Sequence, residues 1–131
     1  MLILFHKLLM VLATLSIITG VGTAVFFRQR RYWLKAHKAF NSSAVIFLSA
    51  GVVMAFLAVW QQDGEHLAGL HPFTGVTALG FAIVSLLIGF YQFQAKNRMQ
   101  AFKTLHRWLG RISLILIIAA FVLGLKHAGI F

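Results

Sequence analysis

The 131-residue chain has no cysteine, one proline and only two acidic residues, and these shortages exclude several classes of protein. Without cysteine there is no disulfide, no thiolate-bound iron–sulfur cluster and no covalently attached c-type haem. Charged residues make up 11% of the chain, against about 25% in an average soluble domain. Hydrophobic residues make up 60%, and the mean hydropathy is +0.88. This composition indicates a membrane protein, so the excess of 12 Lys+Arg over 2 Asp+Glu does not point to a nucleic-acid partner.

Four apolar stretches are long enough to cross a bilayer, which takes roughly 20 apolar residues. They cover residues 2–27, 39–60, 72–93 and 109–125. Little of the chain lies outside them, so we expect a single domain over residues 1–131. Its fold class is then an all-α membrane protein, an up-down bundle of four transmembrane helices. The first stretch is interpreted as a retained helix and not as a signal peptide, because its basic cluster follows the apolar run.

The basic residues are concentrated in two of the three connections. Arg28, Arg30, Arg31, Lys35 and Lys38 flank the first connection, and Lys96, Arg98, Lys103, Arg107 and Arg111 flank the third. The middle connection, residues 61–70, contains both acids (Asp63 and Glu65) and neither Lys nor Arg. The positive-inside rule therefore predicts cytoplasmic first and third connections and both termini on the non-cytoplasmic side. Such a multi-pass protein suits a bacterial inner membrane as well as an organellar or plasma membrane.

A weak internal repeat accompanies this layout. Residues 26–37 and 92–106 both run from an aromatic or amide residue through a basic segment to a histidine that opens the next helix. Two hairpins related by an axis along the membrane normal would produce such a repeat.

Four of the six histidines occur once per predicted helix, near a helix end. His6 and His71 belong to the first and third helices near the non-cytoplasmic face, whereas His37 and His106 belong to the second and fourth near the cytoplasmic face. Alternate helices of an up-down bundle are diagonally opposite, so each pair faces across the bundle axis. Two axial imidazoles approach a haem iron from opposite sides in this way. The pattern therefore predicts two bis-histidine haem sites, with irons about 20–27 Å apart along the membrane normal by residue counting.

Other interpretations of the histidines remain open at this point. A lone histidine near the membrane interface is more often a capping or interfacial residue, and we place His66 and His127 in that class because neither has a partner at the same depth. Structural zinc takes four protein ligands, which two histidines do not supply. No Asp or Glu lies in any span, which argues against transport by a carboxylate relay.

Two glycines and four basic residues are further candidates for haem contacts. Gly75 and Gly110 each follow a histidine by four positions, on the same helix face, where a missing side chain would admit a porphyrin edge. Glycines in membrane helices more often serve close helix packing. Arg31, Lys35, Arg107 and Arg111 bracket His37 and His106, where they could pair with haem propionates or simply set the topology.

At these residues the sequence resembles the four-helix core of the cytochrome b561 family, most closely the eukaryotic type, which includes forms attached to DOMON domains. The resemblance rests on His6 through Met10, on Trp33 with His37, on the His-x-x-x-Gly of His71 and Gly75, and on the His-Arg-x-x-Gly-Arg that runs from His106 to Arg111. It implies transmembrane electron transfer through two non-covalent b haems, with His6 paired to His71 and His37 to His106. Family members often have six spans, and some reduce ferric iron with cytoplasmic ascorbate.

The leading hypothesis is therefore an electron-transfer cytochrome or the core of a transmembrane oxidoreductase. Its partners would be membrane lipid together with a protein or small-molecule electron donor and acceptor. The alternative is a membrane anchor or assembly subunit of a larger redox complex, with or without haem.

Overall fold

The computed structural model describes residues 1–62, 64, 69–92 and 99–130, and it is helical almost throughout. The four helices are α1 (Leu2–Phe26), α2 (Trp33–Trp60), α3 (Leu70–Tyr91) and α4 (Met99–His127). All four are long and apolar enough to cross a membrane. The prediction of an all-α protein with four membrane-spanning helices is therefore confirmed.

Two helices begin well before the apolar stretches from which they were predicted. The second was expected to begin at residue 39 and the fourth at residue 109, but α2 begins at Trp33 and α4 at Met99. Hydropathy marks only the part of a helix that lies in hydrocarbon, whereas the hydrogen-bonded backbone continues into the basic segments on either side. As a result His37 and His106 lie inside helices, each at least one turn from the helix start.

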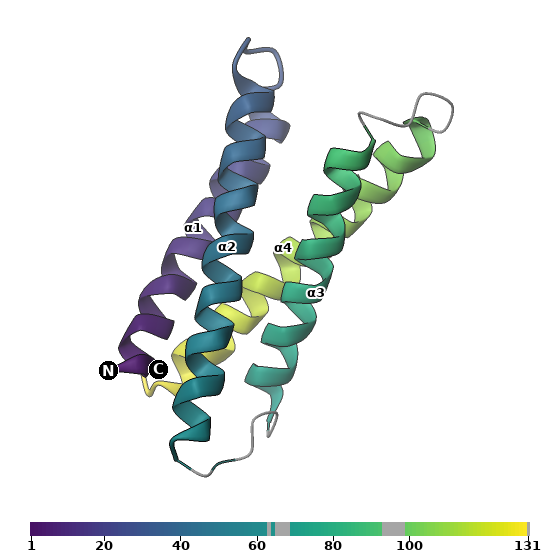
Figure 1. The fold of residues 1–131 in the computed structure, drawn as a ribbon. Helices are drawn as coiled ribbons and strands as arrows, with labels where there is room; N and C mark the ends of the chain where they lie inside the picture. The colour runs from purple at the N-terminus through teal and green to yellow at the C-terminus, as the bar shows by residue number, and fades with distance from the viewer. Residues whose placement is uncertain (63, 65–68, 93–98, 131) are drawn as a thin grey trace.

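The helices form two antiparallel hairpins (Figure 1). α1 packs closely on α2, and α3 packs closely on α4. The hairpins touch along α2 with α3 and along α1 with α4. Within the described part of the chain, no close backbone approach joins α1 to α3 or α2 to α4, so these two pairs are the diagonals of the bundle. Both termini lie at the same end of the molecule.

The core repeats from one hairpin to the other. Ala13 and Ile17 of α1 have counterparts 65 residues later in Ala78 and Ala82 of α3, and all four are buried. In the same way Ala44 and Leu48 of α2 have counterparts 69 residues later in Ser113 and Ile117 of α4. Small residues at these positions let the backbones approach closely, as is usual between helices in membranes. The repeat suspected from the sequence therefore extends to the packing of the two hairpins.

The buried hydroxyl groups of Thr14 and Ser113 are satisfied within their own helices. The hydroxyl of Thr14 donates to the carbonyl of Met10 at 2.8 Å, and that of Ser113 donates to the carbonyl of Leu109 at 2.7 Å. Hydrocarbon offers no competing partner, so such bonds remove the cost of burying a hydroxyl in a membrane. Large apolar side chains meanwhile point outward from every helix, among them Leu4, Ile46, Leu87 and Ile115, which are 61–69% exposed. An apolar surface of this extent suits contact with lipid.

Candidate functional site: two histidine pairs on the diagonals of the bundle

The structure brings four histidines together as two pairs. The ring centres of His6 (α1) and His71 (α3) are 6.2 Å apart, and those of His37 (α2) and His106 (α4) are 6.0 Å apart. Each pair therefore joins two helices whose backbones are diagonally opposite and not in contact. Within each pair the ring planes are steeply inclined, at 75° for the first pair and 89° for the second.

Every one of these four rings is held by a hydrogen bond from its Nδ1 atom to a backbone carbonyl of the other helix in its own hairpin. His6 bonds to Gly51 and His37 to Gly20, both at 2.8 Å, while His71 bonds to Ala120 and His106 to Ser85, both at 2.9 Å. A carbonyl oxygen only accepts, so Nδ1 must carry the proton and donate it. In the neutral ring this leaves Nε2 with a free lone pair, as in a metal-ligating histidine whose other nitrogen is fixed by a backbone carbonyl.

The acceptor carbonyls follow a strict register. Each lies fourteen residues after the histidine of its own helix: Gly20 after His6, Gly51 after His37, Ser85 after His71 and Ala120 after His106. Fourteen residues make close to four helical turns. The histidine and the acceptor therefore lie on the same face of their helix, about 21 Å from each other along its axis. The two histidine pairs are therefore separated by about 21 Å along the helices, most of the thickness of a bilayer's hydrocarbon core.

The spacing within each pair fits axial ligation of one iron. Two in-line metal–imidazole bonds of about 2.0 Å, with each ring centre about 1.1 Å beyond its nitrogen, place the ring centres about 6 Å apart. No group of three or more His, Cys, Asp or Glu able to hold a metal occurs among the described residues. Two nitrogens alone leave most metals under-coordinated, but they complete the shell of a haem iron, whose other four ligands come from the porphyrin. The donor set and its spacing therefore fit haem.

Gly75 and Gly110 were expected to leave room for a porphyrin edge, which stays a prediction, and neither contacts a histidine ring. A Cβ atom added at Gly75 would meet nothing within 4 Å, so there is open space at this position. One added at Gly110 would lie 3.6 Å from the hydroxyl of Ser85, an ordinary contact. At Gly89 and Gly124, each on the helix that neighbours the histidine's own, an added Cβ atom would instead meet the ring of His106 or His71.

Sequence reasoning missed Gly89 and Gly124, although a signal for them exists. Small residues recur fourteen and eighteen positions after each of the four histidines: Gly20 and Ala24, Gly51 and Ala55, Ser85 and Gly89, Ala120 and Gly124. Counting from a histidine along its own helix does not show that these small residues contact the histidine of the neighbouring helix. This contact follows only from the antiparallel pairing of the two helices within a hairpin.

The four basic candidates Arg31, Lys35, Arg107 and Arg111 have exposed side chains. The Nε atom of Arg107 donates to the carbonyl of Lys103 at 3.2 Å, and the Arg111 guanidinium lies 5.2 Å from the centre of the Trp108 ring. Of the other charged residues in the connections, Asp63, Glu65, Lys96 and Arg98 lie outside the described residues. The ring of Trp33, one turn before His37, lies 6.3 Å from the ring of that histidine.

The structure tests the expectation for one of the two remaining histidines. His127, expected to have no partner, stacks on His71 with ring centres 6.2 Å apart and planes 15° apart. The expectation was wrong because α4 extends two residues beyond the predicted span and brings His127 to the level of His71. His66 lies outside the described residues.

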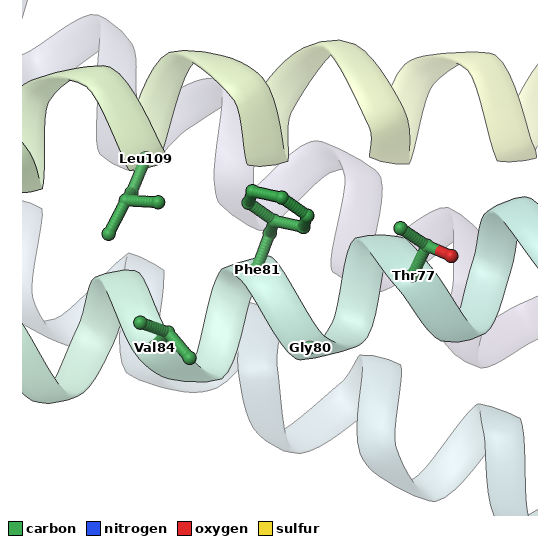
Figure 2. Close-up of a pocket in the computed structure, with 5 residues that line it drawn as sticks. All are labelled: Thr77, Gly80, Phe81, Val84 and Leu109. Atoms are coloured by element: carbon green, nitrogen blue, oxygen red, sulfur yellow. The ribbon is translucent and has the colours of Figure 1, made fainter.

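An apolar cavity of about 370 Å³ lies between α3 and α4, and none of the four paired histidines is among its lining residues (Figure 2). It is lined by Thr77, Gly80, Phe81, Val84 and Leu109. The hydroxyl of Thr77 already donates to the carbonyl of Phe73 at 2.8 Å, which leaves this lining without a free donor to orient a ligand. The histidine pairs are therefore a stronger candidate for the functional site than this cavity.

The fold and the paired histidines define a class of protein: an integral, multi-pass membrane protein whose helices hold imidazole pairs near both ends of the bundle. The family model for eukaryotic cytochrome b561 matches residues 3–131, so the chain belongs to the cytochrome b561 family. Members of this family bind haem b and transfer electrons across membranes. The family predicted from the sequence is thus confirmed.

A mouse (Mus musculus) protein named Ferric-chelate reductase 1 is 25% identical to the chain over 112 residues. The match covers 85% of this chain but only 19% of the mouse protein, so the chain spans about a fifth of that relative's length. No solved structure matches the chain.

Proposed function

We propose that the chain transfers single electrons across the membrane through two bis-histidine sites for haem b, one formed by His6 and His71 and the other by His37 and His106. The observation that carries this proposal is the repeated ligand geometry. Four imidazoles, paired across the diagonals at about 6 Å, each donate Nδ1–H to a carbonyl of the neighbouring helix and keep Nε2 for a metal. When bound, haem would supply an iron that alternates between the ferric and ferrous states at each site.

The chain's own residues would do three things for this reaction. The histidines would occupy both axial positions, which favours outer-sphere electron transfer over binding of oxygen or substrate. The carbonyls of Gly20, Gly51, Ser85 and Ala120 fix the protonated nitrogen, so the ring need not change tautomer to coordinate. The apolar helices exclude water from the interval of about 21 Å between the two sites.

The haem content of the purified chain tests this proposal. We expect a pyridine haemochrome assay to give two non-covalent b haems per chain, and a reduced-minus-oxidised spectrum typical of six-coordinate, low-spin haem. Carbon monoxide should leave the reduced spectrum unchanged, because both axial positions are already occupied. Fewer than one haem per chain would contradict the proposal and favour a haem-free anchor or assembly subunit.

The orientation of the bundle is part of the same proposal. The sites are not equivalent in their surroundings, because His37 and His106 lie at the end that carries Arg31, Lys35, Arg107 and Arg111. The positive-inside rule places this end in the cytoplasm, where it would receive electrons from a soluble donor, and places His6 and His71 beside the acceptor. A redox protein or small molecule could serve on either side.

The absence of cysteine makes this orientation simple to test. A single cysteine introduced at Gly129, next to the C-terminal end of α4, should react with a membrane-impermeant maleimide from the non-cytoplasmic side. A cysteine introduced at Arg30, between α1 and α2, should react only after the cytoplasmic side is opened. The reverse pattern would invert the proposed direction of electron flow.

A further inference from the structure

Two glycines lie against the edges of histidine rings on the second hairpin. A Cβ atom at Gly89 would lie 2.8 Å from Cε1 and 3.1 Å from Nδ1 of His106. One at Gly124 would lie 2.9 Å from Cε1 and 3.4 Å from Nδ1 of His71. Carbon atoms normally approach no closer than about 3.5 Å, so neither ring could keep its present position beside an alanine.

Each of these rings touches two positions of the neighbouring helix, one turn apart. His106 donates Nδ1–H to the carbonyl of Ser85 and lies with Cε1 over Gly89, four residues later. His71 donates to the carbonyl of Ala120 and lies with Cε1 over Gly124, again four residues later. Residues four apart share one helix face, so the two contacts together fix both the position and the tilt of the ring.

The tilt of these rings determines the angle between the two imidazole planes of each site. That angle is 89° between His37 and His106 and 75° between His6 and His71. Relief of a clash at Gly89 or Gly124 would require the ring to turn about its Cβ–Cγ bond or to lengthen its hydrogen bond. A ring that turns in this way would change the angle between the imidazole planes of its own pair and not that of the other pair.

We propose that Gly89 and Gly124 are positioning residues that set the plane of one axial imidazole in each site, Gly89 through His106 and Gly124 through His71. The inference rests on the proposed function, since it concerns how the two haems would be ligated. The relative orientation of axial imidazole planes controls the splitting of the iron d orbitals, and steeply inclined planes raise the largest g value of a low-spin ferric haem. The glycines would thus set a spectroscopic property of each site separately.

The test compares Gly89→Ala and Gly124→Ala with matched controls on the same haem-loaded, full-length chain. Gly80→Ala in α3 and Gly22→Ala in α1 serve as controls, because a Cβ atom at either position would meet nothing within 4 Å. All four substitutions raise helix propensity alike, so a difference between them reflects the ring contact and not the backbone. Low-temperature electron paramagnetic resonance of the oxidised protein, together with the haem count, is the measurement.

We expect Gly89→Ala to shift or abolish the low-spin signal of one site and Gly124→Ala to do the same to the other. Both controls should retain the two signals of the wild type. Unchanged spectra for Gly89→Ala and Gly124→Ala, or a shift of both signals by either variant, would overturn the inference. A wild-type chain that lacks two low-spin signals would instead count against the proposed function, which keeps the two failures distinguishable.

Discussion

Replacement of His106 by alanine should lower the haem content from two per chain to one. His37 would lose the imidazole 6.0 Å away on the opposite side of its site, and a single axial histidine from one helix no longer bridges the diagonal of the bundle. The His6–His71 pair is about 21 Å distant along the helices and should retain its haem. The measurement is a pyridine haemochrome assay, normalised to protein, on chains that elute as the wild type does in size-exclusion chromatography.

A set of related variants makes this prediction specific. His37→Ala combined with His106→Ala should lose no more haem than His106→Ala alone, because both residues serve the same site. His71→Ala combined with His106→Ala should lose both haems, since the effects of independent sites add. His127→Ala is the matched control: it also removes an imidazole next to His71 but no proposed ligand, and it should retain two haems. Loss of both haems from a folded His106→Ala chain would show that the sites are not independent.

The repeated register explains how a chain this short can hold two sites. Each helix contributes one histidine to one pair and one carbonyl acceptor to the other, fourteen residues apart. Every helix therefore takes part in both sites, and the two ends of the bundle are built from the same four elements. Because the spacing is close to four full turns, the same face of each helix carries both the histidine and the acceptor carbonyl.

The main features of this architecture could be predicted from the sequence because they depend on amino-acid composition and on the spacing of apolar runs and histidines along the chain. Long apolar runs separated by basic or acidic connections predict the number of spans. One histidine per helix, near alternating ends, predicts two pairs of histidines at the same depth. The diagonal placement of His6 with His71 and of His37 with His106 followed from the up-down order of four helices. None of these predictions depends on how each helix is rotated about its own axis.

Features that depend on helix rotation and neighbour contacts could not be predicted in the same way. The carbonyl acceptors are backbone groups and leave no residue signature beyond the small side chains at their positions. Gly89 and Gly124 cannot be found by counting along the helix of the histidine, because their contacts with the rings cross from one helix to the next. α4 begins at Met99, ahead of the predicted span 109–125, because its first turns, which include Lys103 and Arg107, are too polar to be detected as a span.

Two haem sites near opposite ends of the bundle should carry electrons across a sealed bilayer, which can be measured in vesicles. The haem-loaded chain would be reconstituted into vesicles that contain trapped ferricyanide, and dithionite would be added outside. We expect the trapped ferricyanide to be reduced much faster than in protein-free vesicles, and His106→Ala to lower this rate to the protein-free level. A wild-type chain with two haems that reduces trapped ferricyanide no faster than His106→Ala or bare vesicles would contradict this expectation.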